Sequence, residues 1–505
     1  MYKVYPVIKT ENFCDDYTVK INGAEVNLDT ARVSKVPFNR RWPGHQRELS
    51  QTELINFLSL ATDEELHFEI IPKDPFEKVT IRPHSLGIEP EIKDGVISFT
   101  LKKPAYFTVE PFGRRRALHI FADPISNYNI DKNDENVIYF GKGEHDAGFI
   151  DLKSNQTLFI DEGAVVYACI RAIDAENIKI LGRGILDNSK NKEQILFEYN
   201  AENNDMAIEN AIREHTVQLE YCTNIEIDGI TIRDSLVYNI RPVGCKNINI
   251  SNVKIIGCWR YNSDGIDMHN CINVLIDNCF IRTFDDSICV KGFDCYYEGD
   301  VEKAVHEAMY RDGKAYDVFQ NVLIRNCVVW NDWGKSLEIG AETRAEEICN
   351  VIFEDCDVIH ITGPAIDCFN VDYAYVHHIT YRNINVELDD HLLFPSLQGF
   401  DGEDFDETNT DYVVDLVNIA VAYHPEYSAG GNRRGKNHDI LVENVNVYGW
   451  QDFRCSFLGN DEDHKTKNVV VKNLYRNGKH LETTEEFEWE PKEFTENIVF
   501  DNGLN

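Results

Sequence analysis

One pattern of polar and apolar positions returns along most of the chain. It begins with an asparagine and a branched aliphatic residue, continues with a second apolar residue two positions on, and ends with Asn, Asp or Gly before another apolar pair. Clear examples read TNIEIDGITI, KNINISNVKI, INVLIDNCFI and QNVLIRNCVV. The leading asparagines are Asn177, Asn224, Asn247, Asn273, Asn321, Asn350, Asn468 and Asn497. They lie 47, 23, 26, 48, 29, 118 and 29 residues apart, which we interpret as single steps of about 23–29, doubled steps and one long stretch with insertions.

Self-similarity at such a period is typical of a solenoid. Each repeat holds short segments in which apolar and polar residues alternate, with no room for a helix. The sequence therefore predicts a parallel β-helix, in which each strand pairs with the equivalent strand one coil on and the interior is a stacked aliphatic column. Asparagines that recur at one turn are expected to form hydrogen-bonded ladders. The alternative is a β-sandwich with evenly spaced strands.

The first 125 residues follow a different rhythm. Short alternating segments such as FEIIP, ISFTL and YFTVE are separated by Pro, Gly and charged turns. This predicts an all-β chain with an N-terminal β-sandwich-like domain over 1–125 and a right-handed parallel β-helix over 126–505. The segment FADPISNYNIDKNDEN reads as the linker, and VIYFGKGEH begins the second part.

Two segments interrupt the repeats. Residues 292–317 have helical spacing in their middle, and residues 391–413 are acidic and aromatic. Insertions in a solenoid emerge on one face, which is often the binding face. We expect each to form a wall of a cleft or, alternatively, an oligomer contact.

Composition narrows the class of partner. The chain has 505 residues, with 50 Lys+Arg against 86 Asp+Glu, for a net charge of −36. Nucleic acids and anionic membranes need a clustered basic surface, which is not seen, and no apolar run approaches the roughly 18 residues of a membrane span. The 14 cysteines are interpreted as buried free thiols in a reducing compartment. A cytoplasmic location is expected, and a secreted chain with a trimmed leader is left open.

Carboxylates gather when the strand after each repeat is aligned with its neighbours. The aligned segments are YNIRP (238–242), GIDMH (265–269), SICVK (287–291), SLEIG (336–340) and AIDCF (365–369). The inward column becomes Ile240, Ile266, Ile288, Leu337 and Ile366, and the outward column becomes Arg241, Asp267, Cys289, Glu338 and Asp367. Strands one coil apart lie about 4.8 Å from each other, so members of a column are near neighbours.

Three aspartates meet just before two of these strands. The alignment places Asp264 on Asp286, with Asp285 beside them. Carboxylates this close cannot all ionise easily, so at least one pKa should be raised. One protonated acid for a leaving oxygen and one ionised partner for water are what the hydrolysis of an acetal needs. The alternatives are an Asp-rich turn and a calcium site.

The motifs NSDGID (262–267) and DDSICVKG (285–292) resemble the two central motifs of the polygalacturonase family of glycoside hydrolases, family 28. The relation extends to the dextranase and isopullulanase family, family 49, which is also β-helical. GRGILD (182–187) is similar to the Gly-rich coil of the family, and the resemblance covers about residues 138–475. It implies that Asp285 is the general acid. It also implies that Asp264 and Asp286 position and deprotonate the water, with inversion at the anomeric carbon.

Two departures from the family bear on the substrate. In WNDWGKSLEIGAE (330–342), Lys335 stands where polygalacturonases have the histidine of a Gly-His-Gly motif. In GPAIDCF (363–369), Ala365 and Asp367 replace an Arg-x-Lys pair that grips the carboxylate of galacturonate. A neutral α-glucan or a plant or gut glycan is therefore favoured over polygalacturonate.

Further residues are candidates for binding the sugar. Four aromatic residues flank the carboxylates and could stack on pyranose rings, or pack at coil corners: Trp259, Tyr261, Trp330 and Trp333. Six polar residues could contact hydroxyl groups: Lys291, Lys335, Glu338, Asp267, His269 and Arg241. For Lys291 and Lys335 the alternative is an exposed salt bridge. Tyr423 and His424 are weaker candidates for the rim of the cleft.

The sequence thus predicts an O-glycosyl hydrolase that needs no cofactor or metal and cleaves an α-linked oligo- or polysaccharide. Neither nucleic acid nor membrane is an expected partner, and a homo-oligomer is left open. One alternative is a calcium-dependent polysaccharide lyase or epimerase on the same scaffold. A second is a β-helix that binds glycans without catalysis.

Overall fold

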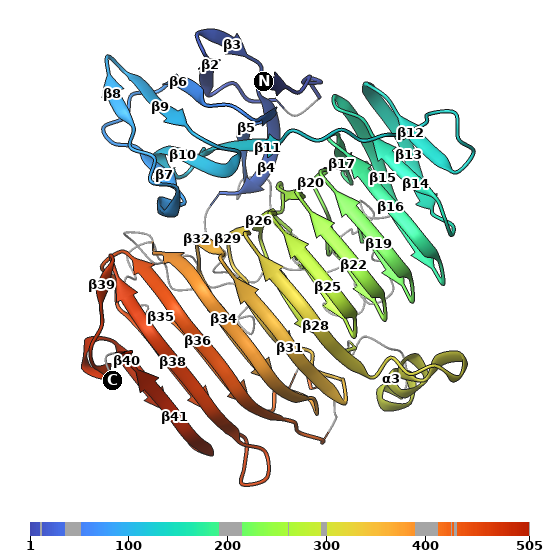
Figure 1. Ribbon diagram of the computed structural model, residues 1–505, viewed down its shortest axis with the longest axis vertical. Coiled ribbons are helices and arrows are strands. Elements are labelled where there is room, and N and C mark those ends of the chain that lie inside the picture. The colour runs from blue at the N-terminus through green and yellow to red at the C-terminus, as the bar shows by residue number, and fades with distance from the viewer. Residues whose placement is uncertain are drawn as a thin grey trace, which may run out of the picture.

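A computed structural model describes residues 1–10, 13–35, 52–190, 215–260, 262–293, 300–388, 413–425, 427–428 and 432–503. Figure 1 shows two β-structured parts, with the N-terminal part seated against the flank of a long stack of strands. The first part ends with β11 (Leu118–Pro124) and the second begins with β12 (Val137–Phe140).

The N-terminal part consists of two sheets. One contains β1 (Tyr2–Val4), β4 (Asp29–Ser34), β5 (Thr52–Thr62), β7 (Thr80–Arg82), β10 (Ala105–Arg114) and β11. The other contains β2 (Tyr17–Ile21), β3 (Ala24–Val26), β6 (Leu66–Pro72), β8 (Glu91–Lys93) and β9 (Val96–Leu101). Alternate residues of both sheets meet in one core, where Phe68 stacks on Phe99 at 5.2 Å and meets Phe107 of the opposite sheet edge-on at 6.2 Å. The predicted β-sandwich-like domain is confirmed.

The remainder forms one parallel sheet of 30 strands wound into coils, which confirms the predicted right-handed β-helix. The long strands β13 (Gly143–Asp151) and β15 (Ala164–Ile173) belong to its first coils, and the other strands lie in three faces. The first face holds β12, β14 (Thr157–Ile160), β16 (Glu176–Gly182), β19 (Thr223–Asp228), β22 (Lys246–Ser251), β25 (Ile272–Asp277), β28 (Val318–Arg325), β31 (Glu347–Glu354), β34 (Tyr375–Glu387), β36 (Lys436–Tyr448), β38 (Thr466–Arg476) and β41 (Thr495–Asp501).

The other two faces complete each coil. The second holds β17 (Ile185–Asp187), β20 (Thr231–Arg233), β23 (Lys254–Ile255), β26 (Phe280–Thr283), β29 (Val328–Asn331) and β32 (Asp357–His360). The third holds β18 (Val217–Glu220), β21 (Ile240–Val243), β24 (Ile266–His269), β27 (Ile288–Lys291), β30 (Leu337–Ala341), β33 (Ile366–Asn370), β35 (Val414–Val421), β37 (Phe453–Leu458) and β40 (Glu488–Pro491). The short β39 (Lys479–His480) pairs antiparallel with β38.

The interior of the β-helix is the predicted aliphatic column. Ile240, Ile266, Ile288, Leu337 and Ile366 are all fully buried and belong to one continuous core. Because successive side chains of a strand point to opposite faces, burial of this column turns the intervening residues outward. That alternation fixes the position of the carboxylates.

Asparagine ladders run along the first face, as predicted. Asn177, Asn224, Asn247, Asn273 and Asn321 each donate from Nδ2 to Oδ1 of the asparagine one coil earlier, over 2.8–3.1 Å. All have φ between 58° and 60°, a left-handed conformation that asparagine tolerates better than most residues. The ladder hydrogen-bonds the exposed turns of successive coils to each other.

The doubled steps of the repeat were wrongly interpreted. The asparagine pairs separated by 47 and by 48 residues are directly hydrogen-bonded, so each step is one coil with an insertion. In the long gap after Asn350, the register places His378 and Asp439 at the ladder position of the two intervening coils. Both also have φ of 55°. The chain keeps the geometry of the turn there while changing its residue type.

The described cysteines are free, and all of them except the half-buried Cys14 are buried. Most lie in the core of the β-helix, where they behave as small apolar residues. Their burial agrees with the prediction.

Helices are few and short in the described residues. α3 (Val301–Met309) lies within the first predicted insertion and confirms its helical spacing; Asp300 caps its N-terminus by accepting from the backbone N–H of Lys303. The 3-10 segments are η3 (His84–Leu86), η4 (Arg311–Gly313) and η5 (Thr484–Glu486). None of these described helices has the length and apolar character needed to cross a bilayer. The second predicted insertion lies, except for its last residue, outside the described residues.

The two parts share a buried interface along the second face. Lys254 donates from Nζ to both oxygens of Asp123, at 3.0 and 3.1 Å, with both side chains almost fully buried. Phe121 of the first part packs against Phe280 of the second at 5.1 Å.

Candidate active site

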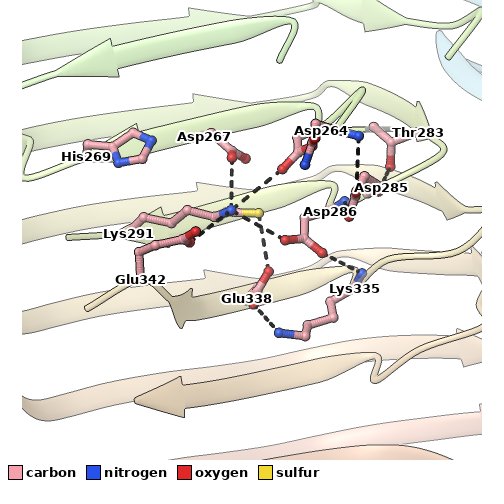
Figure 2. Close-up of polar contacts among 12 residues, drawn as sticks. Asp264, Asp267, His269, Thr283, Asp285, Asp286, Lys291, Lys335, Glu338 and Glu342 are labelled. Carbon is pink, nitrogen blue, oxygen red and sulfur yellow. Dashed lines mark hydrogen bonds and ion pairs between the residues drawn. The ribbon is translucent and has the colours of Figure 1, made fainter. Parts of the chain in front are cut away.

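The register of β24 and β27 brings the predicted aspartates together. Ile266 pairs with Ile288 and Asp267 with Cys289, so Asp264 lies opposite Asp286 in the coil before it. One carboxylate oxygen from each of Asp264, Asp285 and Asp286 lies within 4.8 Å of the other two. Figure 2 shows these side chains converging at the ends of neighbouring strands.

The backbone of the cluster is held from behind. The carbonyl oxygen of Asp285 accepts from Thr283 Oγ1 at 2.6 Å and from Asn331 Nδ2 at 2.7 Å. Gly334 of the next coil packs so closely that a Cβ there would lie 2.5 Å from the carbonyl carbon of Asp285 and from the nitrogen of Asp286. Only glycine fits at this position without moving the aspartates.

Asp285 carries a proton at neutral pH that it can donate. Burial, with the negative charge of Asp286 adding to it, raises the pKa of Asp285 to about 8. Among the described residues, its oxygens accept from the backbone N–H groups of Asn262 and Asp286, at 3.2 and 3.0 Å. With this pKa the carboxyl is mostly protonated at neutral pH, and the residue is 7% exposed.

Asp286 has the opposite character. Burial would raise its pKa, but the positive charges of Lys291 and Lys335 outweigh burial, and the pKa lies below its ordinary value. Its Oδ2 lies 3.4 Å from Lys291 Nζ, and its Oδ1 accepts from the backbone N–H of Lys335 at 3.0 Å. The side chain is 15% exposed, so an ionised carboxylate lies beside a neutral one at the surface.

Lys291 is the hub of the cluster. Its Nζ lies within 3.6 Å of four carboxylates, namely those of Asp264, Asp267, Asp286 and Glu342. Burial raises the pKa of Asp264 well above its usual range, and the charges of Asp267 and Asp285 raise it further. Of the three clustered aspartates, Asp286 is therefore the only one whose pKa is lowered.

A second lysine, Lys335, forms ion pairs with two carboxylates of the outward column, Glu338 and Asp367. Lys335 Nζ lies 2.5 Å from Glu338 Oε1 and 3.1 Å from Asp367 Oδ2. Both carboxylates are fully buried, whereas the lysine side chain is 23% exposed. Among the acidic residues aligned on this face, Asp285 and Asp286 are the most exposed. Asp267, Glu338 and Asp367 are fully buried and form ion pairs.

Two predicted polar residues flank the cluster. His269 lies beside Lys291 in the paired strand and is buried; its Nδ1 contacts the carbonyl oxygen of Gly292 at 2.8 Å. Burial lowers the pKa of His269 well below its usual value, so the ring is neutral. Arg241 lies in the coil before Asp267 and is half-buried.

The predicted aromatic platform is wrong for Trp330. Its ring is fully buried on the second face, packs on His119 of the N-terminal part at 5.4 Å, and donates to Asp332 at 2.8 Å. Trp333 is 8% exposed, belongs to the core of the β-helix and stacks on Phe284.

Trp259 is also buried, with 6% exposed. Its Nε1 donates to Asp234 at 3.0 Å, and the guanidinium of Arg260 covers the ring at 4.0 Å. The described contacts of Trp259, Trp330 and Trp333 are thus contacts within the protein. They agree with the alternative interpretation, in which these side chains pack at the corners of coils. Tyr261 lies outside the described residues.

Two residues that the sequence interpretation missed belong to the site. Glu342 contributes a fourth carboxylate to Lys291, and the same alternation that turns Glu338 outward would have placed it there. Tyr427 lies in an irregular segment after β35, and the charges of Lys335 and Asp285 act on its phenol group. Burial raises the pKa of Tyr427 above its usual value. No periodicity in the sequence could have indicated this tyrosine.

The aspartate cluster could also hold a cation, because three carboxylate oxygens within 4.8 Å suit a hard metal ion. However, Lys291 Nζ already lies 3.6 Å from Asp264 and 3.4 Å from Asp286. Its ammonium supplies the positive charge that a metal would bring.

The aspartate cluster lies in a region of the chain that matches a known protein family. Residues 145–391 match the model of glycosyl hydrolases family 28. The match includes every residue of the aspartate cluster and confirms the resemblance predicted from NSDGID and DDSICVKG.

The curated relatives that match this chain are named as polygalacturonases, and each matches it over part of its own length. A probable polygalacturonase of Vitis vinifera is 36% identical over 86 residues, which cover 17% of this chain and 18% of the relative. A polygalacturonase of Gossypium barbadense is 26% identical over 211 residues, which cover 39% of this chain and 49% of the relative. The chain thus spans less than half the length of the curated relatives it matches.

Among solved structures, Dex49A from Penicillium minioluteum is similar over nearly the whole chain. The TM-score is 0.51 at 14% identity, covering 98% of this chain and 89% of the other. At this identity the likeness concerns the fold alone, and it supports the β-helical architecture described above.

Proposed function

We propose that this protein hydrolyses an α-glycosidic bond in an oligo- or polysaccharide. One observation carries the proposal: Asp285, with its pKa raised to about 8, lies beside Asp286, with its pKa lowered, at the surface of the β-helix. Two carboxyl groups whose environments separate their pKa values provide the acid and the base of glycosidic cleavage. The family match supports the same reaction.

In the proposed reaction, Asp285 gives its proton to the glycosidic oxygen as the bond from that oxygen to the anomeric carbon breaks. Asp286 takes a proton from a water molecule, whose oxygen forms the new bond to the anomeric carbon from the opposite side. The product then has the inverted configuration. Asp264, with its raised pKa, positions the water rather than serving as the main base.

The compactness of the cluster favours a second candidate mechanism. Inverting enzymes usually separate their two carboxyl groups by about 6.5–9.5 Å to leave room for water, and retaining enzymes by about 5–5.5 Å. Here the nearest oxygens lie within 4.8 Å. In the retaining alternative, Asp286 attacks the anomeric carbon itself. Inversion remains our proposal because the family resemblance and the third carboxylate of Asp264 support it.

The charges beside the aspartates favour a neutral sugar at the point of cleavage. Lys335 is partly exposed, but its charge is shared by Glu338 and Asp367. Lys291 is buried among four carboxylates. Neither lysine is left to bind the carboxylate of a uronate. Polygalacturonate is the alternative substrate because the curated relatives are named for it.

The test is a panel of α-linked glucans, plant glycans and oligogalacturonides, each incubated with the protein and with its Asp285→Asn variant. Proton NMR during the first minutes identifies the released sugar and its anomer. A β-anomer as first product, absent with the variant, is expected. An α-anomer would overturn inversion, and an unsaturated product that needs calcium would replace hydrolysis by a lyase reaction. Binding without turnover, equal in the variant, would replace it by a glycan-binding β-helix.

A further inference from the structure

A second cluster of reactive side chains lies on the first face of the β-helix, separate from the aspartates on the third. It consists of Glu347 and Cys349 of β31 and His377 of β34. A carboxylate oxygen, the thiol sulfur and a ring nitrogen of these residues all lie within 4.8 Å of one another. The proposed hydrolysis uses none of them.

The parallel register builds this cluster. Cys349 is the paired partner of His377 in the adjacent strand, so one coil spacing separates them. Glu347 precedes Cys349 by two residues and shares its outward face. Strand pairing therefore fixes the three side chains before any ligand arrives.

The imidazole ring of His377 is oriented at both nitrogens. Nε2 contacts Glu347 Oε1 at 2.6 Å, and Nδ1 contacts Nδ1 of His378. A ring nitrogen held in this way by a neighbour is the usual support of a metal-binding histidine. His438 of the next coil stacks on the ring at 5.5 Å, which limits its rotation.

The cluster is accessible from solvent. The Glu347 side chain is 38% exposed and that of His377 is 12% exposed, whereas Cys349 lies beneath them with 3% exposed. Two neighbours of the cluster, Tyr375, which packs on His377 at 4.4 Å, and His438, line a pocket whose volume is about 760 Å³. The carboxylate and the imidazole are thus nearer the solvent than the sulfur.

We propose that Glu347, Cys349 and His377 bind one divalent transition-metal ion of the zinc type. Thiolate, imidazole and carboxylate together are the donors that Zn²⁺ prefers, and water would complete a tetrahedron. Binding releases the thiol proton to solvent. The remaining proton of the neutral imidazole resides on Nδ1 and is donated to His378. The ion would link two successive coils of the β-helix.

Cobalt(II) titration of the metal-free full-length chain tests this proposal. We expect one equivalent to bind with a near-ultraviolet absorption band of thiolate-to-cobalt charge transfer, and Zn²⁺ to displace it. Cys349→Ser should abolish the band, and Glu347→Gln, at a partly exposed position, should weaken binding at least about tenfold. His378→Asn should weaken it by a similar factor without removing the band.

Matched controls separate this site from the other cysteines and histidines. Cys14→Ser, at the half-buried cysteine of the N-terminal part, and His67→Gln, at an exposed histidine of β6, should both retain the band. Zn²⁺ should raise the melting temperature of the wild-type chain and of Cys14→Ser, but not that of Cys349→Ser. A wild-type chain without the band, or a band that survives in Cys349→Ser, would overturn the proposal.

Discussion

The ammonium nitrogen of Lys291 lies 3.4 Å from Oδ2 of Asp286 and holds that carboxylate in its ionised form. Lys291 also opposes the rise in the pKa of Asp285, but burial and the charge of Asp286 outweigh it, and Asp285 stays protonated to about pH 8. Adjacent residues thus differ in protonation because the charges of Lys291 and Lys335 outweigh burial at Asp286, whereas the charge of Lys291 does not at Asp285. This difference is the basis of the proposed acid and base.

Replacing Lys291 by methionine should raise the pKa of Asp286, because burial would then act without its strongest opposing charge. We expect kcat/KM on a cleaved glycan to fall at least about tenfold at neutral pH, with the acidic limb of the pH profile shifted to higher pH. Lys179→Met, at an exposed lysine paired with Glu226, is the matched control. A Lys291→Met profile that coincides with the wild-type profile would contradict the role of this lysine.

Asp285 should also make the fold less stable as pH rises. Its pKa in the folded state is about 8, above its ordinary value, so the folded chain binds more protons than the unfolded chain between about pH 4 and pH 8. Its contribution to stability is therefore greatest at low pH and is lost as pH rises through that range. Asp285→Asn, which cannot ionise, should melt progressively higher than the wild-type chain between pH 5 and pH 8. A constant difference in melting temperature would contradict the raised pKa.

The asparagine ladder should contribute measurably to stability. Asn247 donates to Asn224 and accepts from Asn273, both over 2.9 Å. Asn247→Gly removes these contacts but keeps the left-handed conformation, so we expect a loss of about 1 kcal/mol. Asn247→Ala adds the cost of positive φ, about 1 kcal/mol more. Thermal unfolding measures both losses, and Asn133→Ala, at an exposed position off the ladder, is the control. Equal melting temperatures for all three variants would exclude a role for the ladder.

Trp330 should matter for stability and not for sugar binding. Its Nε1 donates to Asp332 inside the interface between the two parts. Trp330→Phe should lower the unfolding free energy by about 1–3 kcal/mol, since the Asp332 carboxylate loses a buried donor. KM for a cleaved glycan should stay unchanged. A rise in KM without a loss of stability would restore the aromatic platform predicted from the sequence.

The sequence was sufficient to predict the fold and the aspartate cluster, for one physical reason. In a parallel β-helix, alternation within a strand and pairing between coils determine which side chains are neighbours. Aligning Ile266 with Ile288 was therefore enough to place Asp264 on Asp286. Glu342 lies just past the end of β30, two residues beyond the aligned segment, so the alignment stopped short of it.

The features that were missed depend on contacts outside this rule. Trp330 is buried because the N-terminal part covers the second face, and no repeat indicates which face is covered. Insertions lengthened two coils, so the spacing from Asn177 to Asn224 was taken for two steps. Lys291 and Lys335 have long side chains. The strand register fixes where their backbones lie but not which carboxylates their ammonium groups contact.

The central claim is that Asp285 is the general acid, and the most direct test uses the leaving group of the substrate. The wild-type chain and Asp285→Asn are compared on the glycan that the panel identifies and on a dinitrophenyl glycoside of the same sugar, whose departure needs no proton. We predict that the variant loses at least about 10²-fold in rate on the glycan and keeps a nearly wild-type bond-breaking rate on the dinitrophenyl glycoside. Equal losses on both substrates, or no loss on the glycan, would contradict the assignment of Asp285.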